Sequence, residues 1–152
     1  MKQDAKAYLS EISSQEKRFA ALYRQAAAVF DLSECAMWVL YFLITADKPL
    51  TQQDLIGRMQ FPKQTINSAV SGLAQKGYVE LHMIPGTCNR KNILLTENGA
   101  ELAEGTVKRM RAAEERAAQK LGAEKMAQYI ALHEEFLGAI QREFRKEGLA
   151  DA

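Results

Sequence analysis

The sequence has few of the residues on which several protein classes depend. It contains two cysteines, two histidines, three prolines and one tryptophan in 152 residues. Two cysteines cannot form a disulfide framework, and neither a Cys-x-x-Cys nor a His-Glu-x-x-His spacing is present. A glycine-rich phosphate loop is also missing. We therefore expect no catalytic residues, no metal and no cofactor, and the chain is predicted not to be an enzyme.

Long apolar runs are missing as well. The most apolar stretch, residues 35–44, is too short to cross a bilayer. The N-terminal segment MKQDAKAYLSEISSQEKRF is polar and lacks the apolar centre of a signal peptide. A cytoplasmic location without membrane contact is therefore expected.

The residues from Thr51 to Gly77 predict two short helices joined by a tight connection. Thr51 and Asp54 have the spacing of a capping box, and Pro62 suits the first position of a second helix. Gly77 suits a left-handed cap at its end. One side of the second helix is apolar at helical spacing, with Ile66, Ala69, Val70 and Leu73. The opposite side is polar and has no acid, with Lys63, Gln64, Thr65, Asn67, Ser68 and Ser71.

An acid-free polar side has the chemistry that DNA bases and phosphates require. Gln and Asn amides pair with adenine edges, and Ser and Thr hydroxyls bond to bases or phosphates. We expect contacts to base edges from Gln64, Asn67 and Ser68. We expect contacts to phosphates from Lys63, Thr65 and Ser71. The alternative interpretation is a helix whose polar side is only solvated.

A hairpin with a basic tip is predicted next. Residues 78–84 are strand-like, Pro85-Gly86 marks a turn, and residues 92–96 supply the returning strand. Arg90 and Lys91 lie near the tip, where cations can reach a phosphate or the minor groove. Helix, turn, helix and hairpin in this order predict a winged helix-turn-helix, which inserts one helix into the major groove. The expected fold is mainly α with a small β-hairpin wing.

Charge is nearly balanced overall but not along the chain. The net charge of +1 excludes a generally basic protein that coats nucleic acid regardless of sequence. Residues 51–95 hold five Lys or Arg against two Asp or Glu, a net +3, whereas the rest holds fifteen against seventeen, a net −2. This modest local excess predicts few phosphate contacts per subunit and binding to double-stranded DNA that weakens as salt rises.

The segments PKQTINSAVSGLAQKGYVE and LTENG (Leu95–Gly99) resemble the MarR family of bacterial transcription regulators, and the resemblance extends over nearly the whole chain. The resemblance implies a ligand-responsive regulator that is an obligate homodimer with interlaced N- and C-terminal helices, and we expect it to act as a repressor. Family wings often carry Asp-x-Arg near the tip, whereas this tip reads Thr87-Cys88-Asn89-Arg90-Lys91. Asn89 falls where the family Arg is expected, so that role is assigned to Arg90, one position displaced.

The flanking segments predict assembly. Residues 1–30 and 122–152 have helix-spaced apolar series and are expected to form the helical dimerisation region. Residues 31–121 are expected to form the DNA-binding region. Within it, Ser33 is expected to cap an apolar helix, and Thr96 to cap a long closing helix that runs to Leu121, with a break at Gly122. A symmetric homodimer reads half-sites about 34–36 Å apart, which predicts a pseudo-palindromic operator. The alternative is that the last helix packs back on its own subunit.

The resemblance also implies a small-molecule effector, often anionic or phenolic, bound between the dimer helices and the DNA-binding lobe. Such a crevice would be lined by Tyr23, Phe30, Met37, Trp38 and Tyr41, although such residues are also typical of a core. Cys35 is expected to be buried and Cys88 exposed, and redox sensing by either stays an alternative. The alternative to DNA binding as a whole is a winged-helix protein-interaction module.

Overall fold

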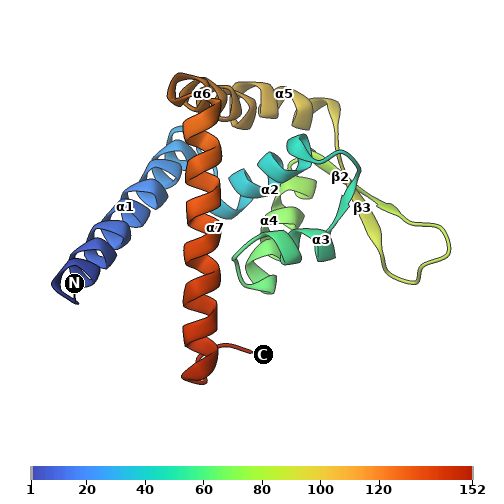
Figure 1. Ribbon diagram of the computed structural model, residues 1–152. Coiled ribbons are helices and arrows are strands. Elements are labelled where there is room, and N and C mark those ends of the chain that lie inside the picture. The colour runs from blue at the N-terminus through green and yellow to red at the C-terminus, as the bar shows by residue number, and fades with distance from the viewer. Residues whose placement is uncertain (1, 152) are drawn as a thin grey trace. The chain divides into compact units, whose positions relative to one another are not determined.

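The computed structural model describes residues 2–151, which contain seven helices and three short strands. The elements in order are α1 (Lys2–Val29), α2 (Glu34–Thr45), β1 (Leu50–Thr51), α3 (Gln52–Arg58), α4 (Lys63–Gln75), β2 (Val79–Met83), β3 (Lys91–Leu95), α5 (Glu97–Gly105), α6 (Val107–Leu121) and α7 (Ala123–Lys146) (Figure 1). They divide into two compact units, one ending at Arg111 and the other beginning at Ala112. The predicted mainly helical fold with a small hairpin is confirmed.

A sharp bend separates α1 from α2. Asp31 has a φ of 55°, in the left-handed region that side chains other than glycine rarely adopt. The Ser33 hydroxyl then accepts a hydrogen bond from the backbone N–H of Ala36 at 3.1 Å and starts α2, as predicted. The two helices differ in direction by 92°. Among the described residues, no single helix is long and apolar enough to cross a membrane, although α1 and α2 together reach that composition as a bent pair.

The core of the first unit is built around α2, which packs against α1, α4, α5 and β3. Burying one such large apolar side chain contributes roughly 1.5–3 kcal/mol. These buried side chains come from α2 and from the elements around it, and their packing fixes the position of α4 against α2. The largest fully buried side chains are Met37, Val39, Leu40, Leu50, Leu55, Ile66, Val70, Ile93 and Val107.

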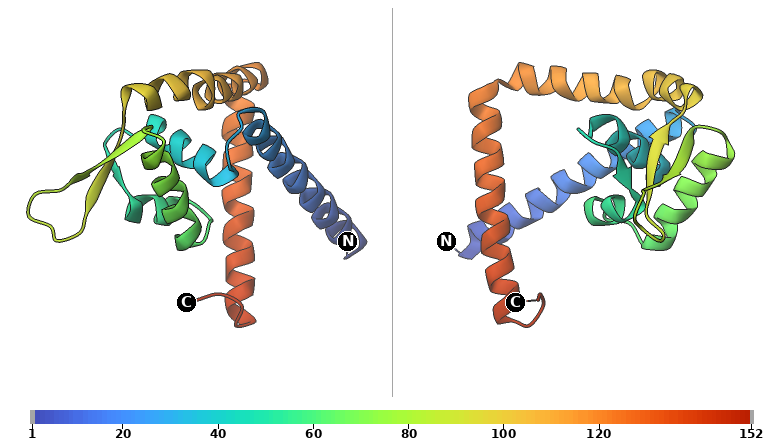
Figure 2. Two further views of the ribbon diagram at one scale, coloured as in Figure 1. Left: turned by 180° about the vertical axis from the view of Figure 1, so that it is seen from behind. Right: turned by 90° about the vertical axis from the view of Figure 1, so that its right-hand side faces the viewer.

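The three strands form one antiparallel sheet in the order β1-β3-β2. β2 pairs with β3 from Val79 opposite Leu95 to Met83 opposite Lys91. β1 adds the pairs Leu50 with Ile93 and Thr51 with Asn92. β1 was not predicted, because two residues are too few to show alternation. The β2–β3 hairpin extends away from α2, α3 and α4 (Figures 1 and 2).

The single closing helix predicted from Thr96 to Leu121 is instead two helices. Thr96 caps α5 as expected, accepting a hydrogen bond from the Gly99 N–H at 3.0 Å. At Thr106 the backbone leaves the helical region, with φ −127° and ψ −94°. Its N–H bonds to the Ala103 carbonyl at 3.3 Å, and its hydroxyl donates to the Leu102 carbonyl at 2.7 Å. The buried Thr106 hydroxyl thus bonds to the Leu102 carbonyl, which the break would otherwise leave unpaired. The apolar periodicity of the sequence does not reveal this break.

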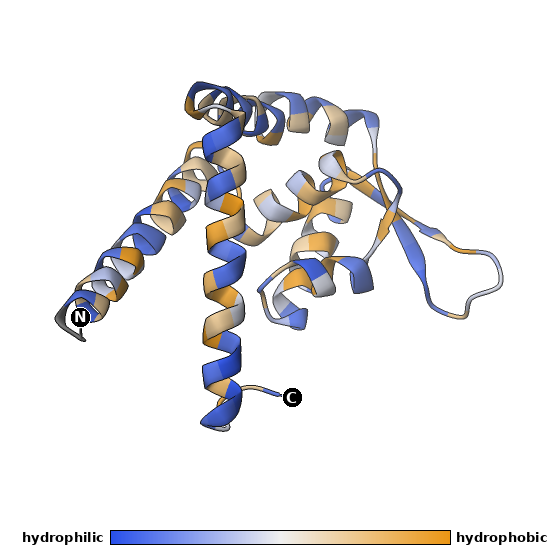
Figure 3. Cartoon of the chain, in the orientation of Figure 1, coloured by the Kyte–Doolittle hydropathy of each residue, from blue (hydrophilic) through white to orange (hydrophobic). Residues whose placement is uncertain are grey.

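The second unit contains the end of α6 and α7. Gly122, with a φ of 94°, separates the two helices at the predicted break. No residue of α7 is buried, and apolar positions recur along it between hydrophilic ones (Figure 3). After α7 the chain turns at Gly148, and the Leu149 N–H donates to the Phe144 carbonyl at 2.8 Å. The large exposed apolar side chains on α7 are Tyr129, Ile130, Leu132, Phe136, Leu137 and Phe144.

Candidate nucleic-acid interface

The helix pair begins with the predicted capping box. The Thr51 hydroxyl accepts from the Asp54 N–H at 3.2 Å, and Asp54 Oδ2 accepts from the Thr51 N–H at 2.8 Å. These hydrogen bonds from the backbone and hydroxyl of Thr51 lower the pKa of Asp54, and the charges of Arg90 and Lys48 lower it further. α3 therefore starts at a defined residue beside the sheet.

The connection between α3 and α4 is short and anchored at both ends. α3 ends at Arg58, and Met59 is buried with its N–H bonded to the Leu55 carbonyl at 2.8 Å. Pro62 is the N-cap of α4 and not its first helical residue, because its ψ of 142° is extended. The proline ring restricts φ but not ψ, so it suits either position. The prediction of the helix start was wrong by one residue.

α4 has the two sides that its sequence predicts. Ile66, Val70 and Leu73 are buried against the core, and Ala69 is half-buried. No acid occurs from Leu55 to Val79, so the outward side carries no negative charge. Of the six predicted contact residues, Asn67 is half-buried, and the exposed ones are Lys63, Gln64, Thr65, Ser68 and Ser71.

The corner between α4 and the wing is held by the start of α5. Gly77 has a φ of 77°, as the predicted left-handed cap requires, and the Tyr78 N–H bonds back to the Leu73 carbonyl at 2.9 Å. The Thr96 hydroxyl donates to the Gly77 carbonyl, and the Thr96 N–H donates to that of Tyr78 at 3.1 Å. A Cβ at Gly99 would lie 1.8 Å from the Tyr78 carbonyl oxygen. This contact gives a steric reason for the glycine in LTENG, which sequence reasoning took only from the resemblance.

The wing carries its two cations just beyond the loop. The Ile84 N–H bonds to the Arg90 carbonyl at 2.9 Å, and the Thr87 hydroxyl donates to the Ile84 carbonyl at 2.7 Å. These bonds close a loop of five uncharged residues, 85–89, that includes the exposed Cys88. Arg90 and Lys91 are exposed at the start of the returning strand. Both cations therefore lie on the same hairpin that follows α4.

The five predicted crevice residues lie in α1 and α2 and in the turn between them. The rings of Tyr23 and Trp38 have centroids 4.9 Å apart, and those of Trp38 and Tyr41 are 5.2 Å apart. All three side chains are half-buried, as is Phe30, whereas Met37 is fully buried in the core. Arg111 on α6 donates to the Tyr41 hydroxyl at 2.8 Å, a contact that was not predicted because the two residues are 70 positions apart in the chain.

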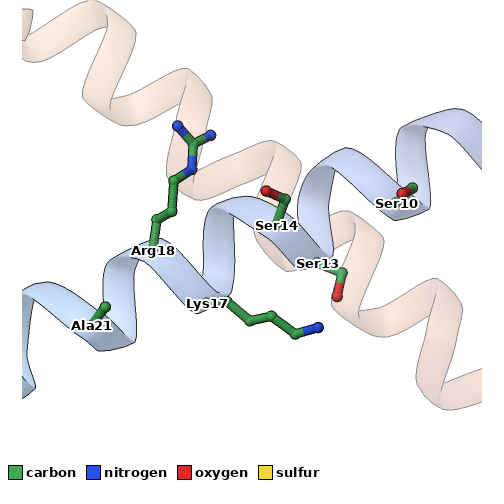
Figure 4. A pocket seen from close by; sticks show the side chains of 6 residues that line it. All are labelled: Ser10, Ser13, Ser14, Lys17, Arg18 and Ala21. Atoms are coloured by element: carbon green, nitrogen blue, oxygen red, sulfur yellow. The ribbon is translucent and has the colours of Figure 1, made fainter.

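Two of the hollows on the surface of the described residues are lined partly by polar side chains. One, of about 480 Å³, lies along α1, where Lys17 and Arg18 diverge and Arg18 is 3.4 Å from Glu11 (Figure 4). The other, of about 430 Å³, lies between the start of α2 and α4 and is lined by Cys35, Phe61, Thr65 and Ser68 among others. Burial, and then the charge of Glu34, raise the pKa of Cys35, which disfavours a reactive thiolate.

Within residues 2–151 no group of three or more His, Cys, Asp or Glu side chains could hold a metal ion. What the geometry does bring together is an outward polar helix, a second helix that supports it and a hairpin with two cations. This arrangement defines a winged helix-turn-helix protein.

Comparison with known proteins agrees with this class. A model described as MarR family matches residues 30–86. No curated protein matches the chain. Among solved structures, the chain is similar to the S. aureus MepR–DNA complex, with 24% identity, a TM-score of 0.62, and coverage of 89% of this chain and 97% of that one. The MarR family regulator NMB1585 from Neisseria meningitidis gives 20% identity, a TM-score of 0.70, and coverage of 93% and 98%.

A third similar structure is the PcaV transcriptional regulator from Streptomyces coelicolor in complex with its natural ligand. It gives 19% identity, a TM-score of 0.62, and coverage of 84% of this chain and 92% of that one. Residues 30–86 are thus similar to the MarR family, and the described chain shares the fold of these winged-helix regulators.

Proposed function

We propose that the chain is a ligand-responsive repressor that binds a pseudo-palindromic DNA operator as a homodimer. The observation that carries the proposal is the outward side of α4, which has no acid and is followed by a hairpin with Arg90 and Lys91. An acid-free surface next to exposed cations favours a polyanion and offers amide and hydroxyl groups to base edges.

The contacts divide into two kinds. Gln64, Asn67 and Ser68 lie in the first half of α4 and are proposed to reach base edges. Phosphate contacts are proposed for the remaining polar residues of that side and for the wing. These phosphate residues are Lys63, Thr65, Ser71, Arg90 and Lys91.

The homodimer is proposed from the helices at the two ends of the chain. On α1, Phe19 and Leu22 are 57% and 61% exposed, and on α7 Ile130 is 61% exposed. Burying apolar side chains away from water lowers the free energy, so each of these exposed helix faces favours a partner surface. A second copy supplies both surfaces and places two α4 helices on one duplex, about 34–36 Å apart.

The response to a ligand is proposed from the aromatic cluster of Tyr23, Trp38 and Tyr41. These half-buried rings contact one another between α1 and α2, and Tyr41 accepts a hydrogen bond from Arg111, so the cluster has both apolar surface and a cation. PcaV, which shares the fold, was solved with its natural ligand. A ligand bound here regulates DNA binding only if it favours one spacing of the two α4 helices over another.

A cytoplasmic location is part of the same proposal, since the operator lies there.

The test is selection of duplexes from a random-sequence pool, followed by titration in increasing salt. We expect one pseudo-palindromic sequence to emerge and the affinity to fall as salt rises. Gln64→Ala or Asn67→Ala should change preference at one base pair by about 1–3 kcal/mol, while Lys63→Ala weakens all sequences alike. A chain that enriches no sequence and binds no duplex at low salt would instead support a protein-interaction module.

A further inference from the structure

Arg90 and the first turn of α3 lie on one face of the sheet. The pair Thr51 with Asn92 places the start of α3 beside the returning wing strand. The Ile84–Arg90 hydrogen bond extends the β2–β3 ladder by one residue beyond β3. Because side chains alternate along a strand, Arg90 shares a face with Asn92 and hence with Thr51. The Thr51 hydroxyl donates to Asp54 Oδ2 at 2.9 Å, so the Asp54 carboxylate lies beside Thr51 at this face of the sheet.

We propose that Asp54 is a positioning residue for Arg90, holding its guanidinium beside the helix-turn-helix so that the wing meets DNA in one orientation. The inference rests on the proposed DNA-binding function and extends it to a residue outside the predicted contact set. It assigns Asp54 two roles, as the cap of α3 and as the counter-charge of the wing.

The half of the wing nearest its tip has no acid. Residues 81–96 contain neither Asp nor Glu. Glu80, at the base of β2, lies 3.0 Å from His82 Nε2. The family position expected to hold Asp in this loop is Thr87, whose hydroxyl is bonded to the Ile84 carbonyl. Asp54, bonded to Thr51 at the edge of the sheet, is thus the carboxylate that we assign to Arg90.

The electrostatics of the site agree with this geometry. Besides the hydrogen bonds from Thr51, the positive charges of Arg90 and Lys48 lower the pKa of Asp54. An acid close to a DNA-binding surface repels phosphates unless a cation offsets it. Removing an isolated acid would therefore strengthen DNA binding, whereas removing one that positions Arg90 would weaken it. The sign of the effect distinguishes the two roles.

The experiment is a double-mutant cycle of Asp54→Asn and Arg90→Gln. The probe is the duplex enriched from a random pool, about 30 base pairs long so that it holds two half-sites one helical turn apart. Asn keeps a side-chain oxygen that can accept from the Thr51 N–H, so the α3 cap is retained. We expect Asp54→Asn to weaken binding about threefold in the natural chain and not to weaken it in the Arg90→Gln background.

Two further variants separate charge from folding. Asp54→Glu keeps the charge and is the usual capping-box acid, so it should retain the natural affinity. Lys91→Gln is the matched control, because Lys91 alternates to the other face of β3 opposite Met83 and should add to Asp54→Asn without coupling. Affinities are measured below the onset of thermal unfolding of the least stable variant.

Three results would contradict the proposal. Asp54→Asn that strengthens binding, or that weakens it equally with and without Arg90, overturns the positioning role while leaving DNA binding intact. A natural chain that enriches no duplex overturns the proposed function and this inference together.

Discussion

α4 and α7 both carry an apolar stripe at helical spacing, but the stripes have different surroundings. On α4 the stripe is buried, with Ile66 and Val70 fully covered, and the polar side faces outward. On α7 no residue is buried, and Ile130 remains 61% exposed. α4 is therefore complete within one chain, whereas α7 presents surface that water disfavours. The comparison teaches that periodicity identifies an apolar face without identifying the molecule that covers it.

The largest expected effect concerns the corner that holds α4. Gly99→Ala should lower the free energy of unfolding by about 4 kcal/mol or prevent folding, because its Cβ would overlap the Tyr78 carbonyl oxygen. Gly105→Ala is the control, since a Cβ there meets nothing within 4 Å. Chemical denaturation followed by circular dichroism measures both. Equal stability of the two variants would mean that the α5 contact does not hold the corner.

The same substitution on the two stripes tests the contrast directly. Ile66→Ala should cost about 3 kcal/mol at every protein concentration, because it leaves a cavity in the core of one chain. Ile130→Ala should act on association, so its cost should be largest where the natural chain is dimeric and should fall towards zero as the chain is diluted below its dissociation constant. Denaturation at several concentrations, with sedimentation to measure the oligomer, checks both. A concentration-independent loss in Ile130→Ala would place its partner within the same chain.

An acid introduced on each helix tests the outward sides. Gln64→Glu should weaken binding to the selected duplex about tenfold, because it places a negative charge on the acid-free side of α4. Gln128→Glu makes the same change at an exposed position of α7 and should leave the affinity unchanged. Fluorescence anisotropy at two salt concentrations measures the difference. If both variants lose affinity equally, the effect comes from net charge and not from the α4 surface.

The smallest expected effect comes from the helix starts. α3 begins at a capping box, whereas α7 begins at Gly122 without a side-chain cap. The pKa of Asp54 is lower in the folded chain than its ordinary value of 3.8, so its stabilisation is present above that pH and is lost as pH falls through the folded pKa. Asp54→Ala should cost no more than about 1 kcal/mol at neutral pH.

That loss should shrink on acidification, because the natural chain then loses the same charge-dependent contribution. Denaturation of the natural chain and Asp54→Ala at several pH values below neutral measures the trend. Asp47→Ala, at an exposed loop residue, is the control and should show no comparable trend. A difference that stayed constant down to the lowest pH would mean that the Asp54 charge does not contribute.

Local signals predicted much of the fold. The caps at Ser33, Thr51 and Thr96 and the left-handed Gly77 were all predicted, because each depends on residues within a few positions. The outward side of α4 was also predicted, since one buried stripe orients the rest of a helix. The start of α4 and the break at Thr106 were missed. At both places the alternative backbone satisfies the same local preferences, and distant packing selects between them.

Residue order along each helix was sufficient to predict where the helices begin and which side is apolar, because capping and periodicity act over one or two turns. Three features required the folded chain: the pairing of β1 with the wing, the contact of Gly99 with Tyr78, and the position of Asp54 relative to Arg90. Each joins residues that are more than twenty positions apart, or whose approach is set by strand register. Such contacts follow from the packing of the core and have no signature in a short stretch of sequence.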